Sequence, residues 1–203
     1  MTHRRHAPAT MPLSPEDVVK ARLMDEADLD RTLNRLARQV VELIEDEADP
    51  SERLALIGMQ TRGVHIARRL RDKIEQVEGL RLPFGILDAT MYRDDFRKRF
   101  RQPVVHPTEI PFSVDDRRLV LVDDVLYTGR TTRAALDALM DLGRPASVHF
   151  LAFIDRGLRE LPVRADFVGR VVPTTPGEEV RVRLREMDGE DGVWLVKPTV
   201  ERA

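Results

Sequence analysis

Apolar residues recur along the chain with helical spacing in some segments and as continuous, strand-like runs in others. Between Asp28 and Ala48 they step by four and three positions, which predicts an amphipathic helix. The run Leu54–Met59 has the length of a buried strand, and a second helical pattern follows it and stops at Gly79. Strand-like and helix-like segments therefore alternate in the first part of the chain.

The same alternation continues further along the chain. We expect strands over Pro83–Tyr92, Arg118–Asp123 and Ser147–Ile154, with a helix that ends at Gly143 between the last two. A turn-rich segment then leads to two short strands with the sequences RVRLRE and GVWLVK. Strands that alternate with helices indicate an α/β fold with a mostly parallel sheet and right-handed crossovers.

In two segments the apolar residues have no regular spacing. Residues 1–20 contain Arg, His and Pro but not the apolar stretch of a signal peptide, so we expect a mostly disordered N-terminal extension before a single domain at residues 21–203. Residues 93–116 contain three prolines and no regular pattern. Structureless loops of that length in a compact domain are usually functional, and we expect a mobile loop here.

Composition and charge exclude several classes of site. The 203 residues are 42% hydrophobic and 33% charged, as in an ordinary globular domain, and no apolar run is long enough to span a membrane, so we expect a cytoplasmic protein without a membrane partner. The net charge is −2, so a surface for nucleic acid would have to be a local patch. The absence of cysteine excludes disulfides and cysteine-ligated metals, and the five histidines have no metal-ligand spacing.

The polar residues with the clearest chemistry follow the strand Arg118–Asp123. Asp123 and Asp124 stand where this strand is expected to end, and the segment Thr128–Thr132 opens the next helix. Ligands of open α/β sheets bind outside the carboxyl ends of the strands. Backbone N–H groups at a helix N-terminus bind phosphate, so this segment is a candidate phosphate site.

The two carboxylates must serve a different group, because they would repel a phosphate. They can accept hydrogen bonds from the hydroxyls of a sugar, or they can bind Mg²⁺. A phosphate and a diol held a short distance apart describe a ribose 5-phosphate. A Walker A loop is a poor competitor, because its Gly-Lys-Ser/Thr ending is missing. Taken alone, Asp123 could merely end a strand and Thr131 could merely cap a helix.

The stretch LVLVDDVLYTGRT (Leu119–Thr131) resembles the phosphoribosyl-diphosphate (PRPP) signature of type I phosphoribosyltransferases. The stretches GMQTRGVHIARRL, DATMYRDDF, LGRPASV and DRGLRELPVRADFVGR narrow the resemblance to the PyrR family, from about Asp25 to Lys197. Proteins of that family regulate the pyrimidine (pyr) operon by attenuation and are also uracil phosphoribosyltransferases. The resemblance implies the type I phosphoribosyltransferase fold, a mostly parallel sheet flanked by helices with a C-terminal hood and a flexible loop.

The resemblance also implies a reaction, in which uracil and PRPP give UMP and diphosphate, with Mg²⁺ brought by PRPP. The catalytic residues would be Asp123 and Asp124, which bind the ribose hydroxyls, together with Arg62. Taken alone, an arginine at the start of a helix is more often a solvated residue. The implied PRPP-binding residues are Thr61, Arg62, Gly63, Asp123, Asp124, Val125, Leu126, Tyr127, Thr128, Gly129, Arg130 and Thr131.

Three further residues would meet the nucleobase or the rest of the substrate. They are Arg93, which opens the long loop, Arg156 in the hood segment, and Val180, which would act through its backbone. The long loop would close over the substrates. Its basic run Arg97–Arg101 could screen phosphate charges or could simply be solvated.

The resemblance also implies a regulatory function, in which the protein binds a stem-loop in pyr leader mRNA in response to UMP or UTP. The implied RNA-binding residues are Asn34, Arg35, Arg38, Arg159, Arg164 and Arg170. Leu158 stands where family members often have His, and Asn34 and Arg38 replace an expected Thr and His. Control could act on transcription or translation, and the family forms homodimers or homotetramers. Two alternatives stay open, a plain salvage phosphoribosyltransferase without an RNA role and an RNA-binding regulator with negligible catalysis.

Overall fold

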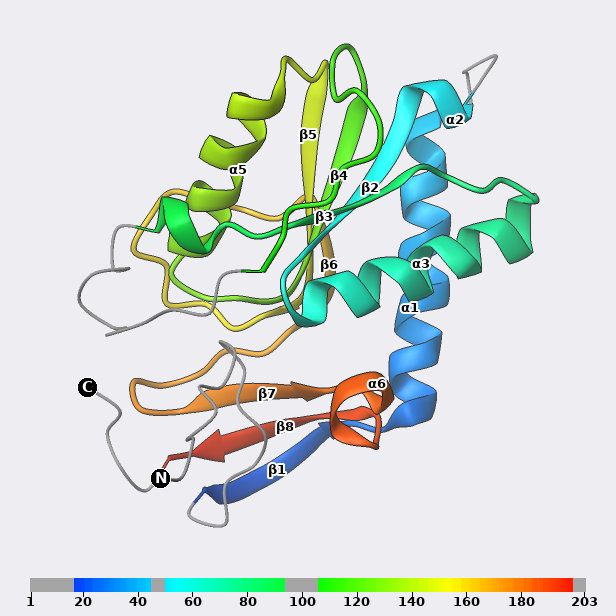
Figure 1. Ribbon diagram of the computed structural model, residues 1–203. Helices are drawn as coiled ribbons and strands as arrows, with labels where there is room; N and C mark the ends of the chain where they lie inside the picture. Colours follow the sequence, from blue (N-terminus) through cyan, green and yellow to red (C-terminus); the bar gives the residue numbers. More distant parts are fainter. Residues whose placement is uncertain (1–16, 45–49, 94–105, 199–203) are drawn as a thin grey trace, which may run out of the picture.

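The computed structural model describes residues 17–44, 50–93 and 106–198, which form two sheets with helices around them (Figure 1). The larger sheet has five strands in the order β3-β2-β4-β5-β6, and all neighbouring strands in it are parallel. The predicted α/β class with a mostly parallel sheet is confirmed. The strands are β2 (Leu54–Met59), β3 (Phe84–Leu87), β4 (Arg118–Leu126), β5 (Ser147–Asp155) and β6 (Phe167–Val171).

Helices cover both faces of the larger sheet, with α1 and α3 on one face and α5 on the other (Figure 1). Along β4, Val120 and Val122 pack in the cluster that contains α1 and α3, whereas Leu119 and Leu121 pack in the cluster that contains α5. Alternate side chains of a strand point to opposite faces, so a strand covered on both sides needs a continuous apolar run. The helices span Glu26–Val41 (α1), Pro50–Arg53 (α2), Arg62–Glu78 (α3) and Arg130–Leu142 (α5), and the 3-10 turn η1 spans Glu42–Ile44.

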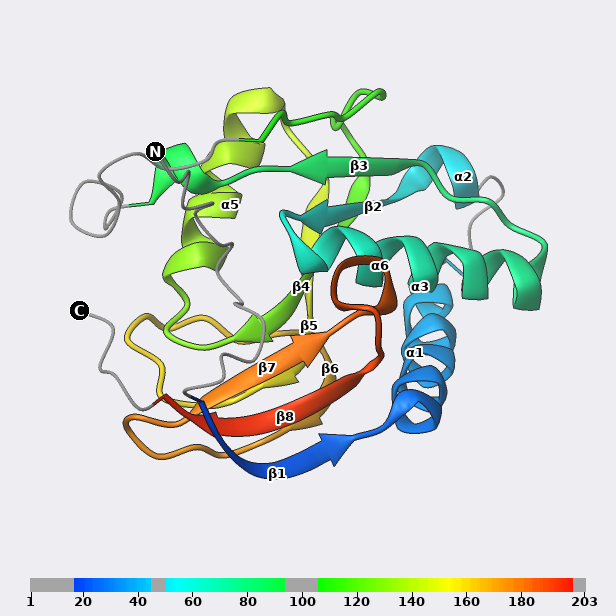
Figure 2. The ribbon, with the colours of Figure 1, turned by 60° about the horizontal axis from the view of Figure 1, so that its bottom comes forward.

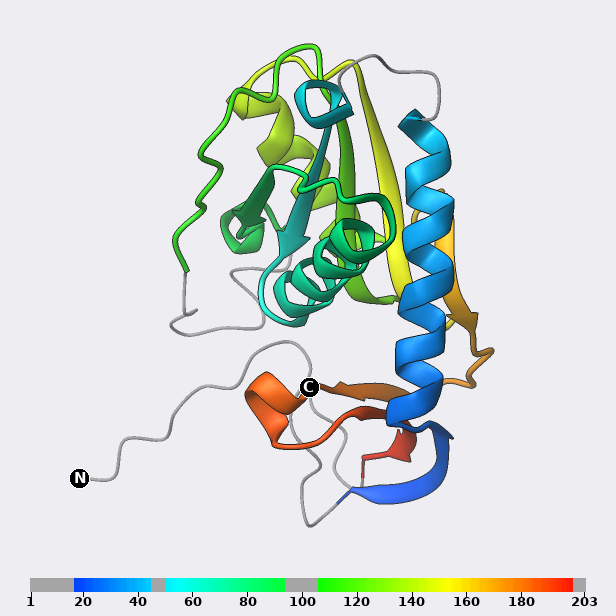
Figure 3. The same cartoon turned by 90° about the vertical axis from the view of Figure 1, so that its right-hand side faces the viewer.

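The smaller sheet is antiparallel, has the strand order β1-β8-β7, and lies below the carboxyl ends of the larger sheet's strands (Figures 1 and 3). It combines a strand from the beginning of the described chain with two from its end. Val182, Leu184 and Val193 pack it into the same apolar cluster as α1 and α3. We call this unit the hood; it consists of β1 (Val18–Met24), β7 (Glu179–Arg183), α6 (Arg185–Asp188) and β8 (Gly192–Lys197).

Several boundaries differ from the sequence predictions. Residues 18–20, expected in the disordered extension, begin β1 instead. The strand predicted over Pro83–Tyr92 ends at Leu87, because the Asp88 side chain accepts a hydrogen bond from the N–H of Thr90 (2.8 Å) and turns the chain into the 3-10 turn η2 (Thr90–Tyr92).

The C-terminal part also departs from the prediction. The turn-rich segment contains β6, a short strand of intermediate and exposed residues at the edge of the larger sheet. The strand expected at RVRLRE lies two residues earlier as β7, and the end of that stretch begins α6. The helix stops predicted at Gly79 and Gly143 are confirmed, and Gly79 adopts the left-handed conformation that glycine accepts without strain. Within the described residues, no helix combines the length and the apolar character of a membrane span.

Candidate active site

The acid pair Asp123–Asp124 lies within β4 rather than at its end, since the strand continues to Leu126. Pairing between β4 and the neighbouring strand β2 ends at Val122. Asp123 and Asp124 are therefore the first residues of β4 that have no β2 strand beside them. Both residues are buried, and the N–H of Asp124 donates to Oδ1 of Asp123 (2.9 Å). Burial raises the pKa of Asp123 well above its usual range, and the adjacent charge of Asp124 raises it further.

The β4–α5 loop (Tyr127–Gly129) leads from the acid pair to the first turn of α5. Gly129 has φ +89°, a left-handed conformation that lets the chain turn sharply into the helix. The carbonyl of Thr128 accepts hydrogen bonds from the N–H groups of Glu160 and Leu161, both at 3.0 Å. The N-cap residue Gly129 has no side chain, and the Thr128 hydroxyl accepts a long hydrogen bond from the N–H of Arg130 (3.4 Å), so this hydroxyl lies at a helix N-terminus that suits an anion.

Arg93 connects the first turn of α5 with the acid pair. Its guanidinium donates to the hydroxyl of Thr131 in the first turn of α5. Its positive charge also opposes, more weakly, the upward shift of the pKa of Asp123. Three residues that the sequence predicts at the substrate therefore lie together. The basic run and half of the expected mobile loop lie in residues 94–105, outside the described residues.

The predicted diphosphate loop Thr61–Gly63 approaches the same place from β2. A Cβ on Gly63 would come within 2.4 Å of the carbonyl oxygen of Val122 and 3.2 Å of Cα of Asp123, so only glycine allows this contact. The guanidinium of Arg62 does not point to solvent. Its Nη2 donates to Oδ1 of Asp188 in α6 at 2.8 Å, and both side chains are almost fully buried. Its predicted contact with diphosphate stays a prediction.

Val180 lies in β7 of the hood, whereas Arg156, expected in the hood segment, directly follows β5 of the larger sheet and reaches the hood from there. Arg156 is buried, and its guanidinium carbon lies 4.1 Å from the ring centroid of Tyr127. Its Nε donates to the hydroxyl of Thr174 (3.1 Å), and its Nη2 donates to the carbonyl of Glu178, two residues before the buried Val180. Burial lowers the pKa of Arg156. Arg156 therefore joins the β4–α5 loop to the start of β7.

The six predicted RNA-binding residues do not form one group. Arg35 and Arg170 line a hollow of about 320 Å³ between α1 and β6, together with Arg31, which the sequence reading missed. Arg31 stands one turn before Arg35 on α1, a spacing that could have signalled it. Arg38 and Arg164 are exposed, and neither side chain makes a hydrogen bond or ion pair with the part of the chain that the structure describes. Asn34 donates to Asp30 (2.9 Å).

Arg159 differs from the rest of that set, because its guanidinium is bound to the β4–α5 loop. It is partly buried, and Nη2 pairs with Oδ2 of Asp155 at 2.5 Å. The other hydrogen bonds that its guanidinium makes within the described residues all go to backbone oxygens. The side chain therefore stabilises the backbone of the β4–α5 loop. Nη1 donates to the carbonyls of Tyr127 (2.7 Å), Gly157 (3.1 Å) and Leu126 (3.4 Å), and Nε donates to that of Val163 (3.1 Å).

Comparison of the sequence with those of known proteins identifies the family to which the chain belongs. A family model for the phosphoribosyl transferase domain matches residues 26–186. The bifunctional protein PyrR of Deinococcus radiodurans is 49% identical over 179 residues, which are 88% of this chain and 96% of the relative. That of Pelotomaculum thermopropionicum is 51% identical over 178 residues, with coverage of 88% and 96%. The chain belongs to the PyrR family.

Solved structures agree at the level of the fold. A hypoxanthine phosphoribosyltransferase from Trypanosoma cruzi, in a ternary complex with substrates, has a TM-score of 0.70 at 15% identity and covers 89% of this chain and 96% of its own. One from Staphylococcus aureus has a TM-score of 0.65 at 17% identity, with coverage of 89% and 94%. The type I phosphoribosyltransferase fold is thereby confirmed.

Membership of the PyrR family confirms the predicted function at the level of the family. PyrR proteins are regulators of the pyr operon that are also uracil phosphoribosyltransferases. Among the described residues, no cluster of three or more His, Asp or Glu side chains could hold a metal ion. The carboxylates of the acid pair nevertheless supply the oxygen ligands that Mg²⁺ prefers, so they fit a cation that arrives with PRPP.

Proposed function

We propose that this PyrR-family protein joins uracil to the ribose 5-phosphate of PRPP in the space between the β4–α5 loop, the acid pair and the hood. The observation that carries this proposal is the close approach of Gly63 to Val122 and Asp123. It brings the Thr61–Gly63 loop beside the acid pair, so that one ligand can touch both. A molecule with a diphosphate, a diol and a phosphate fits such a set of groups.

Each part of PRPP has a counterpart in these residues. The N–H groups at the start of α5 and the hydroxyls of Thr128 and Thr131 bind the 5-phosphate, and Arg93 adds a positive charge beside them. Asp123 and Asp124 bind the ribose hydroxyls. The raised pKa of Asp123 favours retention of a proton there, which relieves repulsion within the pair and lets this carboxyl donate as well as accept.

The reaction depends mainly on how the reactants are positioned and on how the charges that develop on them are stabilised. The bond between C1 of the ribose and the diphosphate oxygen breaks with its electron pair on the diphosphate, N1 of uracil bonds to C1, and the N1 proton passes to the departing diphosphate or to water. Positive charge develops on the ribose in between, and the negative acid pair below the ring favours it. Arg156 and the backbone of Val180 in the hood hold uracil in line, and holding the reactants in place lowers the barrier. Asp123 and Asp124 would hold the Mg²⁺ that arrives with PRPP, and this cation would supply positive charge for the departing diphosphate.

A turnover assay tests the enzymatic half. The protein is supplied with PRPP, Mg²⁺ and either uracil or hypoxanthine, and UMP or IMP is measured. We expect UMP only, and no product when EDTA is in excess. Comparable turnover of hypoxanthine would instead support the purine-salvage alternative, and PRPP binding without any turnover would support the regulator with negligible catalysis.

We further propose that UMP or UTP increases binding of pyr leader RNA to a surface around Arg35, Arg38, Arg164 and Arg170. The hollow lined by Arg31, Arg35 and Arg170 supports this, because its one carboxylate, Asp28, pairs with Arg31 (2.6 Å) and leaves an excess of positive charge on a chain of net charge −2. As a regulator of an operon transcript, the protein would act in the cytoplasm, as a homodimer or homotetramer like others of its family. Equal affinity for leader RNA and a scrambled RNA, with UMP present, would contradict the proposal.

A further inference from the structure

Arginines from the body of the molecule hold the hood at both ends of β7. Arg156 reaches the start of the strand through the carbonyl of Glu178. Arg62 reaches α6, directly after the strand, through Asp188. Val180, which we propose lies beside the nucleobase, is between these two attachments. The position of its backbone therefore depends on both of them.

The Arg62–Asp188 pair is the more deeply buried attachment. The relative exposures of the two side chains are 2% and 3%, and Nη2 and Oδ1 are 2.8 Å apart. The second oxygen of Asp188 accepts a hydrogen bond from the N–H of Leu184 (2.9 Å), which fixes the carboxylate against the end of β7. A buried charge that loses its partner is strongly unfavourable, so Arg62 and Asp188 are held to one geometry.

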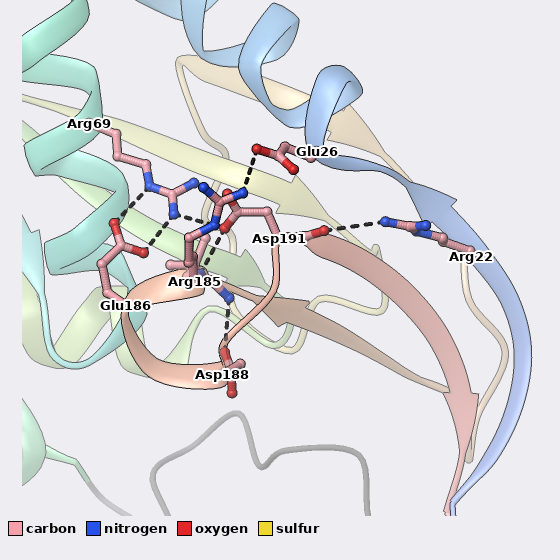
Figure 4. Close-up of polar contacts among 8 residues, drawn as sticks. Arg22, Glu26, Arg69, Arg185, Glu186, Asp188 and Asp191 are labelled. Atoms are coloured by element: carbon pink, nitrogen blue, oxygen red, sulfur yellow. Dashed lines mark hydrogen bonds and ion pairs between the residues drawn. The ribbon is translucent and has the colours of Figure 1, made fainter.

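A second arginine on the same face of α3 makes a parallel attachment. Arg69 follows Arg62 by seven residues, which is two helical turns. It donates to both oxygens of Glu186 (2.8 and 2.6 Å) and to Asp191 (2.8 Å), as Figure 4 shows. Figure 2 shows α6 beside α3. Apolar packing of the hood is non-directional, whereas these ion pairs define how the hood sits on α3.

We infer that Arg62 is a positioning residue for the nucleobase site and not a donor to the diphosphate. Its guanidinium is directed into α6, while the backbone of the same loop faces the acid pair through Gly63. The pair therefore links the diphosphate loop to the hood strand that carries Val180. This inference rests on the proposed uracil transfer, and it predicts that Asp188, which lies outside every predicted PRPP-binding segment, controls the use of uracil.

Steady-state kinetics of three variants test the inference. Asp188→Asn removes the charge but keeps an acceptor for Leu184, and Arg62→Met keeps the apolar stem. We expect each to raise KM for uracil at least fivefold and to leave KM for PRPP within twofold. In the double variant the uracil KM should be no worse than in the singles, because the pair acts as one unit. Glu190→Gln is the matched control, since it removes a half-exposed hood charge that pairs with Arg183; both KM values should stay unchanged.

A tenfold rise in KM for PRPP with Arg62→Met, together with an unaffected Asp188→Asn, would overturn the inference and make Arg62 a direct diphosphate ligand. If the lone buried charge unfolds Asp188→Asn, the double variant replaces it, because it leaves no unpaired charge. Hydrogen exchange of the β7 amides gives a readout independent of turnover. It should accelerate in Asp188→Asn relative to β4, and unchanged exchange would equally overturn the coupling. Absence of uracil turnover in the unaltered protein would instead refute the proposed function.

Discussion

Replacement of Arg159 by Met should impair PRPP binding, although the family resemblance implies an RNA-binding role for this arginine. The substitution keeps the aliphatic stem of a side chain that is 22% exposed and removes the guanidinium. That group donates to four backbone carbonyls and pairs with Asp155, and two of the carbonyls belong to Leu126 and Tyr127 at the β4–α5 loop. Without it, the loop loses its attachment to the segment behind it.

The magnitude follows from these contacts. A hydrogen bond that involves a charged group contributes about 1.5–3 kcal/mol, and simple addition over the whole set would exceed the real loss because the loop carbonyls can bind water instead. In the variant, PRPP must order the loop when it binds, and this cost reduces its binding free energy. If the cost equals one such hydrogen bond, the affinity for PRPP falls about tenfold or more, since ~1.4 kcal/mol corresponds to a factor of ten. The expected effect is therefore a loss of at least tenfold in PRPP affinity.

Calorimetric titration of the protein with PRPP and Mg²⁺ measures this affinity directly. Arg164→Met is the matched control, because Arg164 is exposed and its side chain makes no hydrogen bond or ion pair with the described residues; it should bind PRPP normally and bind leader RNA less well. If Arg159→Met binds PRPP like the unaltered protein but loses leader RNA, the loop attachment is unimportant and Arg159 contacts RNA directly. A variant that combined Arg159 with Arg38 and Arg164 could not separate the two functions.

Three further predictions concern the acid pair and the RNA surface. Asp123→Asn combined with Asp124→Asn should lower PRPP affinity at least tenfold in calorimetry while circular dichroism stays unchanged, because each lost charged hydrogen bond costs about 1.5–3 kcal/mol; unaltered affinity would refute the site. Asp123→Asn alone should raise the Tm of the ligand-free protein at neutral pH, because the raised pKa of Asp123 means that its ionised form destabilises the folded state. That difference in Tm should shrink as the pH falls through the raised pKa of folded Asp123 and vanish below the unfolded pKa of 3.8, where Asp123 is protonated in both states, and a pH-independent difference would contradict the burial argument. Arg38→Gln with Arg164→Gln should weaken leader RNA binding and reduce the slope of log K against log salt by about one unit or less per arginine, with uracil transfer unchanged.

The sequence predicts the central part of the fold well, because there local pattern and tertiary environment agree. β2 has the predicted bounds, since a strand covered on both faces must be apolar at every position. The acid pair and the helix after it were also found, because the change from apolar to polar residues marks the carboxyl end of a buried strand. Only the length of β4 was underestimated, because pairing with β5 continues through Leu126 after β2 has stopped.

The missed features depend on partners that are distant in the sequence. β1 is mostly exposed and has no alternating pattern, and it is a strand because it pairs with β8. Asp188 is 126 residues from Arg62, so no local pattern connects the two. Arg159 is a charged residue in a turn-rich segment, which suggests a solvent-exposed or ligand-binding side chain. Its guanidinium also donates to the carbonyls of Leu126 and Tyr127, which are 33 and 32 residues away and come close only in the folded chain.

The strand order of the hood has a consequence for how the chain folds during synthesis. β1 pairs with β8, which joins Val18 to Lys197, so this sheet closes only after nearly all of the described chain has left the ribosome. Every strand of the larger sheet is complete by Val171. Chains generally begin to fold from their N-terminal side as they emerge, and contacts between distant residues form late. A nascent chain can therefore assemble its larger sheet first, while β1 stays unpaired until β8, the last strand, has been synthesised.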